Sequence, residues 1–135
     1  MKSVITQSNS IKIEKDTITI PTFVDVHVHL REPGFFYKET MKTGTMAAAK
    51  SGYSHVFSMP NLKPVPDTYE HLKEQLDIIE KDAVINVIPY GSITMGEKGG
   101  ELSKMEEMAP YVCGFTDDGV GVESEEMMEA AMIKA

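Results

Sequence analysis

An apolar run rich in β-branched residues recurs four times in the sequence, each time followed by a helical stretch, and this alternation constrains the fold most. The runs are Phe23–Leu30, Tyr53–Met59, Ala83–Pro89 and Tyr111–Thr116. Nearly unbroken apolar strands that alternate with helices are typical of a parallel sheet covered by helices. We therefore expect an α/β fold of about four βα units, either a doubly wound sheet or the first half of a (β/α)8 TIM-type barrel.

Local signals place the helices and a short β segment before the first run. Residues 10–20 alternate weakly between apolar and polar side chains, which predicts one or two short strands. Gly52 is placed to end the first helix in a left-handed conformation. The helices are expected to begin near Tyr37, after a cap at Asp67 or Thr68, after Ser103, and near Ser124.

Composition excludes several classes of protein. The formal net charge is −8, and a nucleic acid or an anionic membrane surface requires a basic partner. A single cysteine cannot form an internal disulfide, which fits a reducing compartment. No segment approaches the roughly 20 apolar residues of a membrane span, and the N-terminus does not resemble a signal peptide. We expect a cytoplasmic protein with a small-molecule substrate.

Polar side chains gather where the predicted strands end. They are His27, His29 and Arg31 after the first run, Asn61 after the second, and Asp117 and Asp118 after the fourth. Neither a G-x-G-x-x-G nor a Walker loop follows the first run, so a nucleotide-binding sheet is disfavoured. In α/β barrels the carboxyl ends of the strands form the active site, and we expect these side chains to lie together there.

The histidine pair is the strongest indication of a metal site. Alternate residues of a strand point the same way, so His27 and His29 share a face with Cα atoms roughly 6.6 Å apart. Two imidazoles at that separation can bind one metal ion. The alternative is a half-exposed strand whose polar face happens to be histidine, but the apolar opposite face and the following R-E-P-G turn favour metal binding.

The other polar residues each allow a simpler interpretation. Asp117 and Asp118 are typical of a turn, although a carboxylate beside two histidines is a plausible third ligand. Arg31 could be a solvated turn residue, but its guanidinium is suited to gripping a substrate carboxylate in a bidentate manner. Asn61 lies in a proline-rich loop, and a turn-forming and a binding role are equally consistent with its sequence.

Four segments together resemble the dihydroorotases, in the cyclic amidohydrolase group of the amidohydrolase superfamily. They read "DVHVHLREPG", "KET", "MPNLKPVPD" and "FTDDGVG", and the resemblance extends from about Thr22 to Ala135. The H-x-H pair alone would indicate only the superfamily. The order and spacing of all four segments indicate the dihydroorotases.

The resemblance implies a zinc-dependent (β/α)8 barrel that interconverts dihydroorotate and N-carbamoyl-L-aspartate in de novo pyrimidine biosynthesis. By position, His27, His29 and Asp118 would bind zinc, with one or two ions per full-length subunit. Arg31 and Asn61 would bind the substrate carboxylate. It also implies a homo-oligomer and, as a possible partner, aspartate transcarbamoylase.

Two alternative functions follow from the same resemblance. Allantoinases and hydantoinases share parts of the pattern, but they carry a carboxylated lysine on strand four where this chain reads Thr116-Asp117-Asp118. A non-catalytic dihydroorotase-like subunit that assembles with aspartate transcarbamoylase is the second alternative, and intact His27 and His29 argue against it.

A complete barrel needs about 250 residues, whereas this chain has 135. We expect residues 22–135 to be the N-terminal half of a longer metal-dependent hydrolase, and residues 1–21 to be a remnant of the β-sandwich that usually precedes the barrel. No catalytic residue is expected within the chain, because the family's general acid/base lies beyond the equivalent of residue 135. The fragment alone is expected to be inactive.

Overall fold

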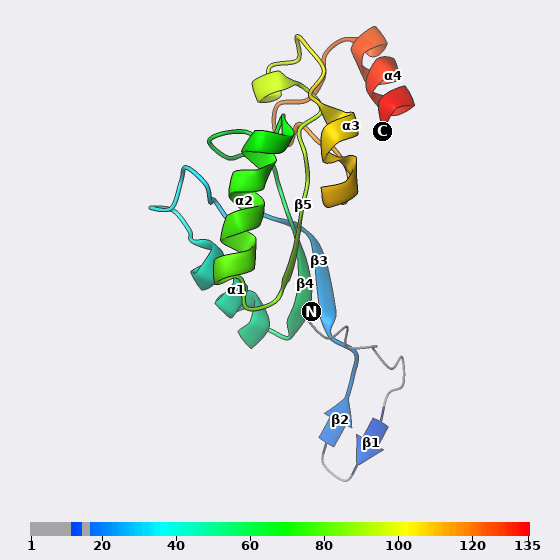
Figure 1. The fold of residues 1–135 in the computed structure, drawn as a ribbon. Helices are drawn as coiled ribbons and strands as arrows, with labels where there is room; N and C mark the ends of the chain where they lie inside the picture. The colour runs from blue at the N-terminus through cyan, green and yellow to red at the C-terminus, as the bar shows by residue number, and fades with distance from the viewer. Residues whose placement is uncertain (1–11, 15–16) are drawn as a thin grey trace.

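A parallel sheet of three strands lies at the centre of the computed structural model, which describes residues 12–14 and 17–135 (Figure 1). The strands lie in the order β3 (Phe23–Val28), β4 (Tyr53–Ser58) and β5 (Asn86–Pro89). Helix α1 (Met41–Lys50) connects β3 to β4, and α2 (Tyr69–Asp82) connects β4 to β5. The α/β class and the parallel strand direction predicted from the sequence are confirmed.

A short antiparallel hairpin precedes the sheet and projects from its lower end in Figure 1. Its strands are β1 (Lys12–Glu14) and β2 (Thr17–Thr19), which agrees with the short strands expected over residues 10–20. Residues 10, 11, 15 and 16 of that stretch, and residues 1–9 before it, lie outside the described part of the chain. The proposed origin of residues 1–21 in a β-sandwich stays a prediction.

The fourth predicted strand, residues 111–116, is not a regular strand, and this expectation was wrong. Its first residue belongs to a 3-10 turn, η2 (Ala109–Tyr111), and a single parallel bridge joins Phe115 to Gly91. Pro110 has no amide hydrogen and favours the turn, and Gly114 adds no side chain to pack. The segment nevertheless runs beside β5, because Cys113 donates its backbone amide to the carbonyl of Pro89 over 3.0 Å.

The longer helices begin where hydroxyl groups cap them. Thr40 caps α1, so this helix begins four residues later than the predicted Tyr37. Thr68 caps α2, and Ser124 caps α4 (Glu125–Lys134) as expected. Ser103 does not cap α3 (Met105–Met108); its hydroxyl donates to the carbonyl of Ser92 instead.

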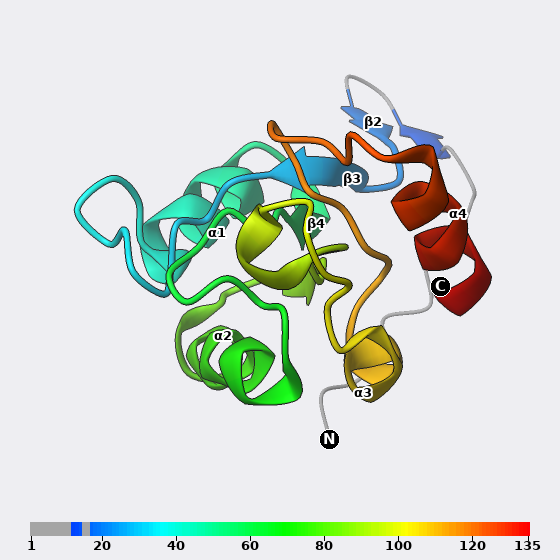
Figure 2. The ribbon, with the colours of Figure 1, turned by 90° about the horizontal axis from the view of Figure 1, so that it is seen from above.

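The main core lies between the sheet and the helices α1 and α2. Leu30, Met41, Val56 and Val87 are buried there, and partly buried side chains of α1 and α2 pack around them. Seen from above, α3 and α4 lie at the opposite side of the molecule from α1 and α2 (Figure 2). Among the described residues, no helix has the length and apolar character needed to cross a bilayer.

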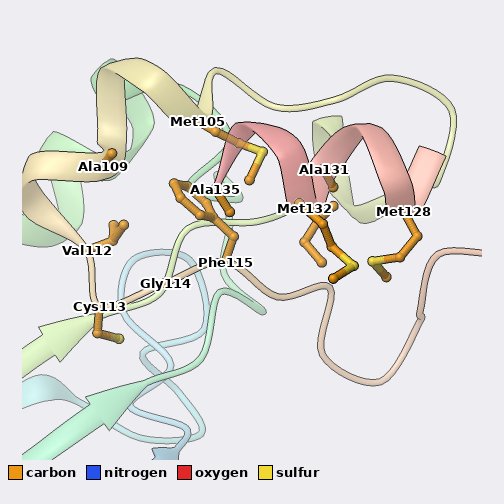
Figure 3. Close-up of a pocket in the computed structure, with 11 residues that line it drawn as sticks. Met105, Ala109, Val112, Cys113, Gly114, Phe115, Met128, Ala131, Met132 and Ala135 are labelled. Carbon is orange, nitrogen blue, oxygen red and sulfur yellow. The ribbon is translucent and has the colours of Figure 1, made fainter. Parts of the chain in front are cut away.

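An apolar pocket of about 290 Å³ lies between α3, residues 112–115 and α4 (Figure 3). Met128 and Met132 extend from the same side of α4 toward it, and Phe115 and Met105 form part of its wall. None of the polar residues predicted for the functional site lines this pocket. The candidate site lies elsewhere, at the carboxyl ends of the strands.

The outer strand β3 leaves apolar side chains in solvent. Val24 and Val26 are 49% and 57% exposed, and within the described residues β3 pairs only with β4. An unpaired edge with exposed apolar side chains is a template for association.

We predict that residues 1–135 self-associate, and that a Val24→Thr, Val26→Lys double variant shifts the chain toward monomer in size-exclusion chromatography with light scattering.

The matched control is Val120→Lys, which adds the same charge at an exposed valine in a loop. This control should leave the distribution of species unchanged. Equal dispersal by the control variant, or a wild-type chain that is already a monomer, would contradict the role of the β3 edge.

Candidate metal centre

Two histidines at the end of β3 and one aspartate from the loop before α4 converge on one point. The Nε2 atom of His27 lies 3.5 Å from Oδ1 of Asp118, and the Nε2 atom of His29 lies 3.4 Å from Oδ2 of the same carboxylate. The two imidazole rings lie edge to face with centroids 5.4 Å apart. The structure therefore brings together the three side chains that the family resemblance implied as metal ligands.

The donor set and its spacing fit a zinc ion. Two imidazole nitrogens and a carboxylate oxygen are common zinc ligands, and ligands about 2.0–2.1 Å from a tetrahedral ion lie about 3.3 Å apart. The ligand atoms of the three residues all lie within 4.8 Å of one another. Partial burial, followed by the charge of Arg31, lowers the pKa of His29, which favours the neutral imidazole that binds metal.

Strand β3 departs from regular pairing where it presents the histidines. Asp25 pairs with Val56 and Val28 pairs with Ser58, so β3 has one more residue than β4 in this interval. Such a bulge re-aims side chains. Oδ1 of Asp25 accepts a hydrogen bond from the backbone amide of His27 over 3.0 Å and holds the irregular stretch in place.

The turn after the histidines is fastened to helix α1. Oε2 of Glu32 accepts a hydrogen bond of 2.6 Å from the backbone amide of Met41, the first residue of α1. A carboxylate is favourable at this end of a helix. Arg31 adopts a left-handed φ of 54° at the start of the turn.

Arg31 belongs to the same rim as the histidines, because its charge contributes to the lowered pKa of His29. Within residues 12–14 and 17–135, its guanidinium forms no ion pair. The side chain is partly buried rather than fully solvated. A partly buried guanidinium without a carboxylate partner is suited to binding an anionic ligand.

The adjacent aspartates have different surroundings. Asp117 is 5% exposed, and its Oδ1 accepts hydrogen bonds from the backbone amides of Ile93 and Thr94 over 2.8 and 3.1 Å. Its Oδ2 accepts the hydroxyl of Thr94. Asp117 thus fastens the loop after β5, whereas the carboxylate of Asp118 is directed at His27 and His29.

Asn61 is held against the same loop. Its Nδ2 donates to the backbone carbonyl of Asp118 over 2.7 Å and to Oε1 of Glu97 over 3.1 Å. Its buried Oδ1 has no hydrogen-bond partner among the described residues. Both amide hydrogens of Asn61 are therefore engaged, so Asn61 does not offer a free donor to a substrate carboxylate in this arrangement.

Glu97 is a site residue that the sequence reasoning missed. It ends a 3-10 turn, η1 (Met95–Glu97), and adopts a left-handed φ of 55°. Burial raises the pKa of its carboxyl to about 7, with a further contribution from Asp117 and an opposing one from its hydrogen bond with Asn61. The glycine-rich stretch "MGEKGG" was the available signal, but it indicates only a loop.

Comparison with known proteins identifies the family that the chain resembles. A family described as Dihydro-orotase-like matches residues 16–135. The chain is 54% identical over 129 residues to a dihydroorotase of Fusobacterium nucleatum, covering 96% of this chain and 30% of that protein. A dihydroorotase of Bacillus cereus is 48% identical over 133 residues, covering 97% of the chain and 31% of the relative.

A dihydroorotase of Staphylococcus epidermidis is 51% identical over 122 residues, covering 90% of this chain and 29% of the relative. The chain belongs to the dihydroorotase-like family, and the resemblance found in the sequence is confirmed. It spans about 30% of the length of these relatives.

The convergence of three ligands leads to a first prediction about the site. His27→Ala and His29→Ala should each lower the zinc content of the protein, measured by elemental analysis, because each removes a donor. The matched control is His71→Ala, since His71 contacts Asp67 rather than the cluster. Full metal stoichiometry in both site variants would contradict the assignment.

The two aspartates provide a second prediction. Asp117→Ala leaves buried donors unpaired and should lower the unfolding free energy of the metal-free protein by about 3 kcal/mol. Asp118→Ala should remove zinc and leave the urea midpoint of the metal-free protein close to that of the wild type. Equal destabilisation by the two variants would show that the residues do not divide their roles in this way.

Proposed function

We propose that the chain forms the metal- and carboxylate-binding part of a dihydroorotase, which interconverts dihydroorotate and N-carbamoyl-L-aspartate. The observation that carries this proposal is the convergence of His27, His29 and Asp118 beside the guanidinium of Arg31, which forms no ion pair within the described part of the chain. Membership of a family whose relatives are named dihydroorotase supports the same reaction.

The proposed architecture is the first half of a (β/α)8 barrel. Three parallel strands and a fourth bridged segment lie side by side, and the ligands lie at or beyond the carboxyl ends of β3 and of that segment. This is the end of the sheet where α/β barrels place their active sites. The general acid/base is proposed to come from outside residues 1–135.

The proposed reaction is hydrolysis of a ring amide. The oxygen of water bonds to the carbonyl carbon, the carbon–nitrogen bond breaks, and the ring nitrogen takes up a proton. A zinc ion held by His27, His29 and Asp118 would supply Lewis-acid activation of the water and of the carbonyl. The carboxylate of Asp118 would offset part of the positive charge of that ion.

Arg31 is proposed to select an acidic substrate. Its planar guanidinium can hold a carboxylate with two parallel hydrogen bonds, which fixes the ring relative to the metal. Hydantoin and allantoin lack the ring carboxylate of dihydroorotate. The presence of Asp118, where allantoinases and hydantoinases carry a modified lysine, also favours the dihydroorotase reaction.

Several finer features belong to the same proposal. They are zinc as the metal, one or two ions per subunit, a role in pyrimidine biosynthesis and a cytoplasmic location. A homo-oligomer and an association with aspartate transcarbamoylase stay predictions. Each follows from the family resemblance rather than from contacts within the chain.

We predict that Arg31→Lys raises the KM for dihydroorotate about tenfold or more in the full-length protein, because lysine keeps the charge but loses the bidentate fork. The zinc content should not change. The matched control is Lys38→Arg, the reverse exchange at an exposed side chain near the same turn. A KM for the Arg31 variant equal to that of the wild type would remove Arg31 from the substrate site.

A further inference from the structure

The side-chain amide of Asn61 is shared between a fixed acceptor and a movable one. The fixed acceptor is the backbone carbonyl of Asp118, at 2.7 Å, in a turn anchored by the buried carboxylate of Asp117. The movable acceptor is the side-chain carboxyl of Glu97, at the longer distance of 3.1 Å. A ligand carboxylate can reach this amide only by replacing Glu97.

The surroundings of Glu97 make this contact easy to exchange. Burial is the main factor that disfavours a charged carboxyl at Glu97, and the negative charges of Asp117 and Asp118 disfavour it further. No lysine or arginine of the described residues forms an ion pair with Glu97. The Asn61 amide is the side-chain group that offsets these costs, and a single hydrogen bond does so only in part.

The backbone of the turn that carries Glu97 is strained and is held by hydrogen bonds. Glu97 has a left-handed φ of 55°, which costs free energy for a residue with a side chain. Gly96 and Gly99 flank it with φ of 62° and 72°, and no atom beyond the chain neighbours lies within 4 Å of a Cβ built on Gly99. The backbone amides of Gly96, Glu97 and Gly99 donate hydrogen bonds to Asp67 and Thr94. The exchange on Asn61 is therefore assigned to rotation of the Glu97 side chain, with the backbone of the turn in place.

We propose that Glu97 is an affinity- and specificity-determining residue, whose carboxyl group occupies the Asn61 amide in the absence of ligand and competes for it with the carboxylate of an anionic substrate. This inference rests on the proposed function. Binding becomes an exchange of one carboxylate for another on Asn61, while Arg31 supplies the additional attraction. A neutral cyclic amide offers no carboxylate for this exchange.

The test compares Glu97→Ala and Glu97→Gln in the full-length protein, with dihydroorotate as the substrate and zinc content, kcat and KM as the measurements. Glu97→Ala removes the competitor, so KM should fall about fivefold with kcat and zinc content unchanged. Glu97→Gln keeps an acceptor of the same size without the charge, so KM should fall less. The matched control is Glu101→Gln, which removes an exposed charge from the same loop and should leave KM unchanged.

A double-mutant cycle isolates the role of Asn61. In an Asn61→Ala background, Glu97→Ala should no longer lower KM, because no amide remains to compete for. A rise of KM together with a loss of kcat in Glu97→Ala would show that Glu97 positions Asn61 for substrate, and would overturn the competition. An unchanged KM, or an equal fall of KM in the Asn61→Ala background, would overturn it as well.

The experiment distinguishes a failure of the proposed function from a failure of the inference on Glu97. A wild-type protein that binds zinc but does not turn over dihydroorotate would refute the proposed function, and the inference on Glu97 with it. Wild-type turnover with no effect of the Glu97 variants would refute the inference alone.

Discussion

The buried carboxylate of Asp117 is the interaction on which the rest of the site depends. It accepts two backbone amides and a hydroxyl from Ile93 and Thr94, and so joins the turn before α4 to the loop after β5. Buried hydrogen bonds to a charged acceptor are strong, and leaving their donors unpaired is costly. Because both loops are held by this one group, Asp118 faces the histidines and Glu97 reaches Asn61.

The metal ligands and their supports come from different kinds of structure. His27 follows the pleat of an outer strand, where a bulge and the carboxylate of Asp25 fix its direction. Asp118 lies in a turn that is held by the buried carboxylate of Asp117 and by the side-chain amide of Asn61. The site therefore combines a rigid strand end with a loop made rigid by buried polar contacts, which is the arrangement that precise ligand placement requires.

Much of this arrangement could be predicted from the sequence, because it depends on local patterns. The apolar runs predicted three parallel strands, and the alternate positions of His27 and His29 in the first run predicted that the two imidazoles lie together. The prediction of a fourth regular strand was wrong because Pro110 and Gly114 interrupt a segment that is otherwise apolar. Glu97 could not be found, since its partner Asn61 lies 36 residues away and only the folded loops bring them together.

The bond between Glu32 and the first amide of α1 has a consequence for the entropy of ligand binding. It ties the backbone next to Arg31 to a helix whose own residues Met41 and Thr45 are fully buried. The conformational freedom of this turn is therefore lost when the chain folds, before any ligand arrives. When an anion binds Arg31, only the outer side-chain bonds of Arg31 remain to be ordered. Binding therefore loses less conformational entropy, and more of the electrostatic attraction between the two charges remains as affinity.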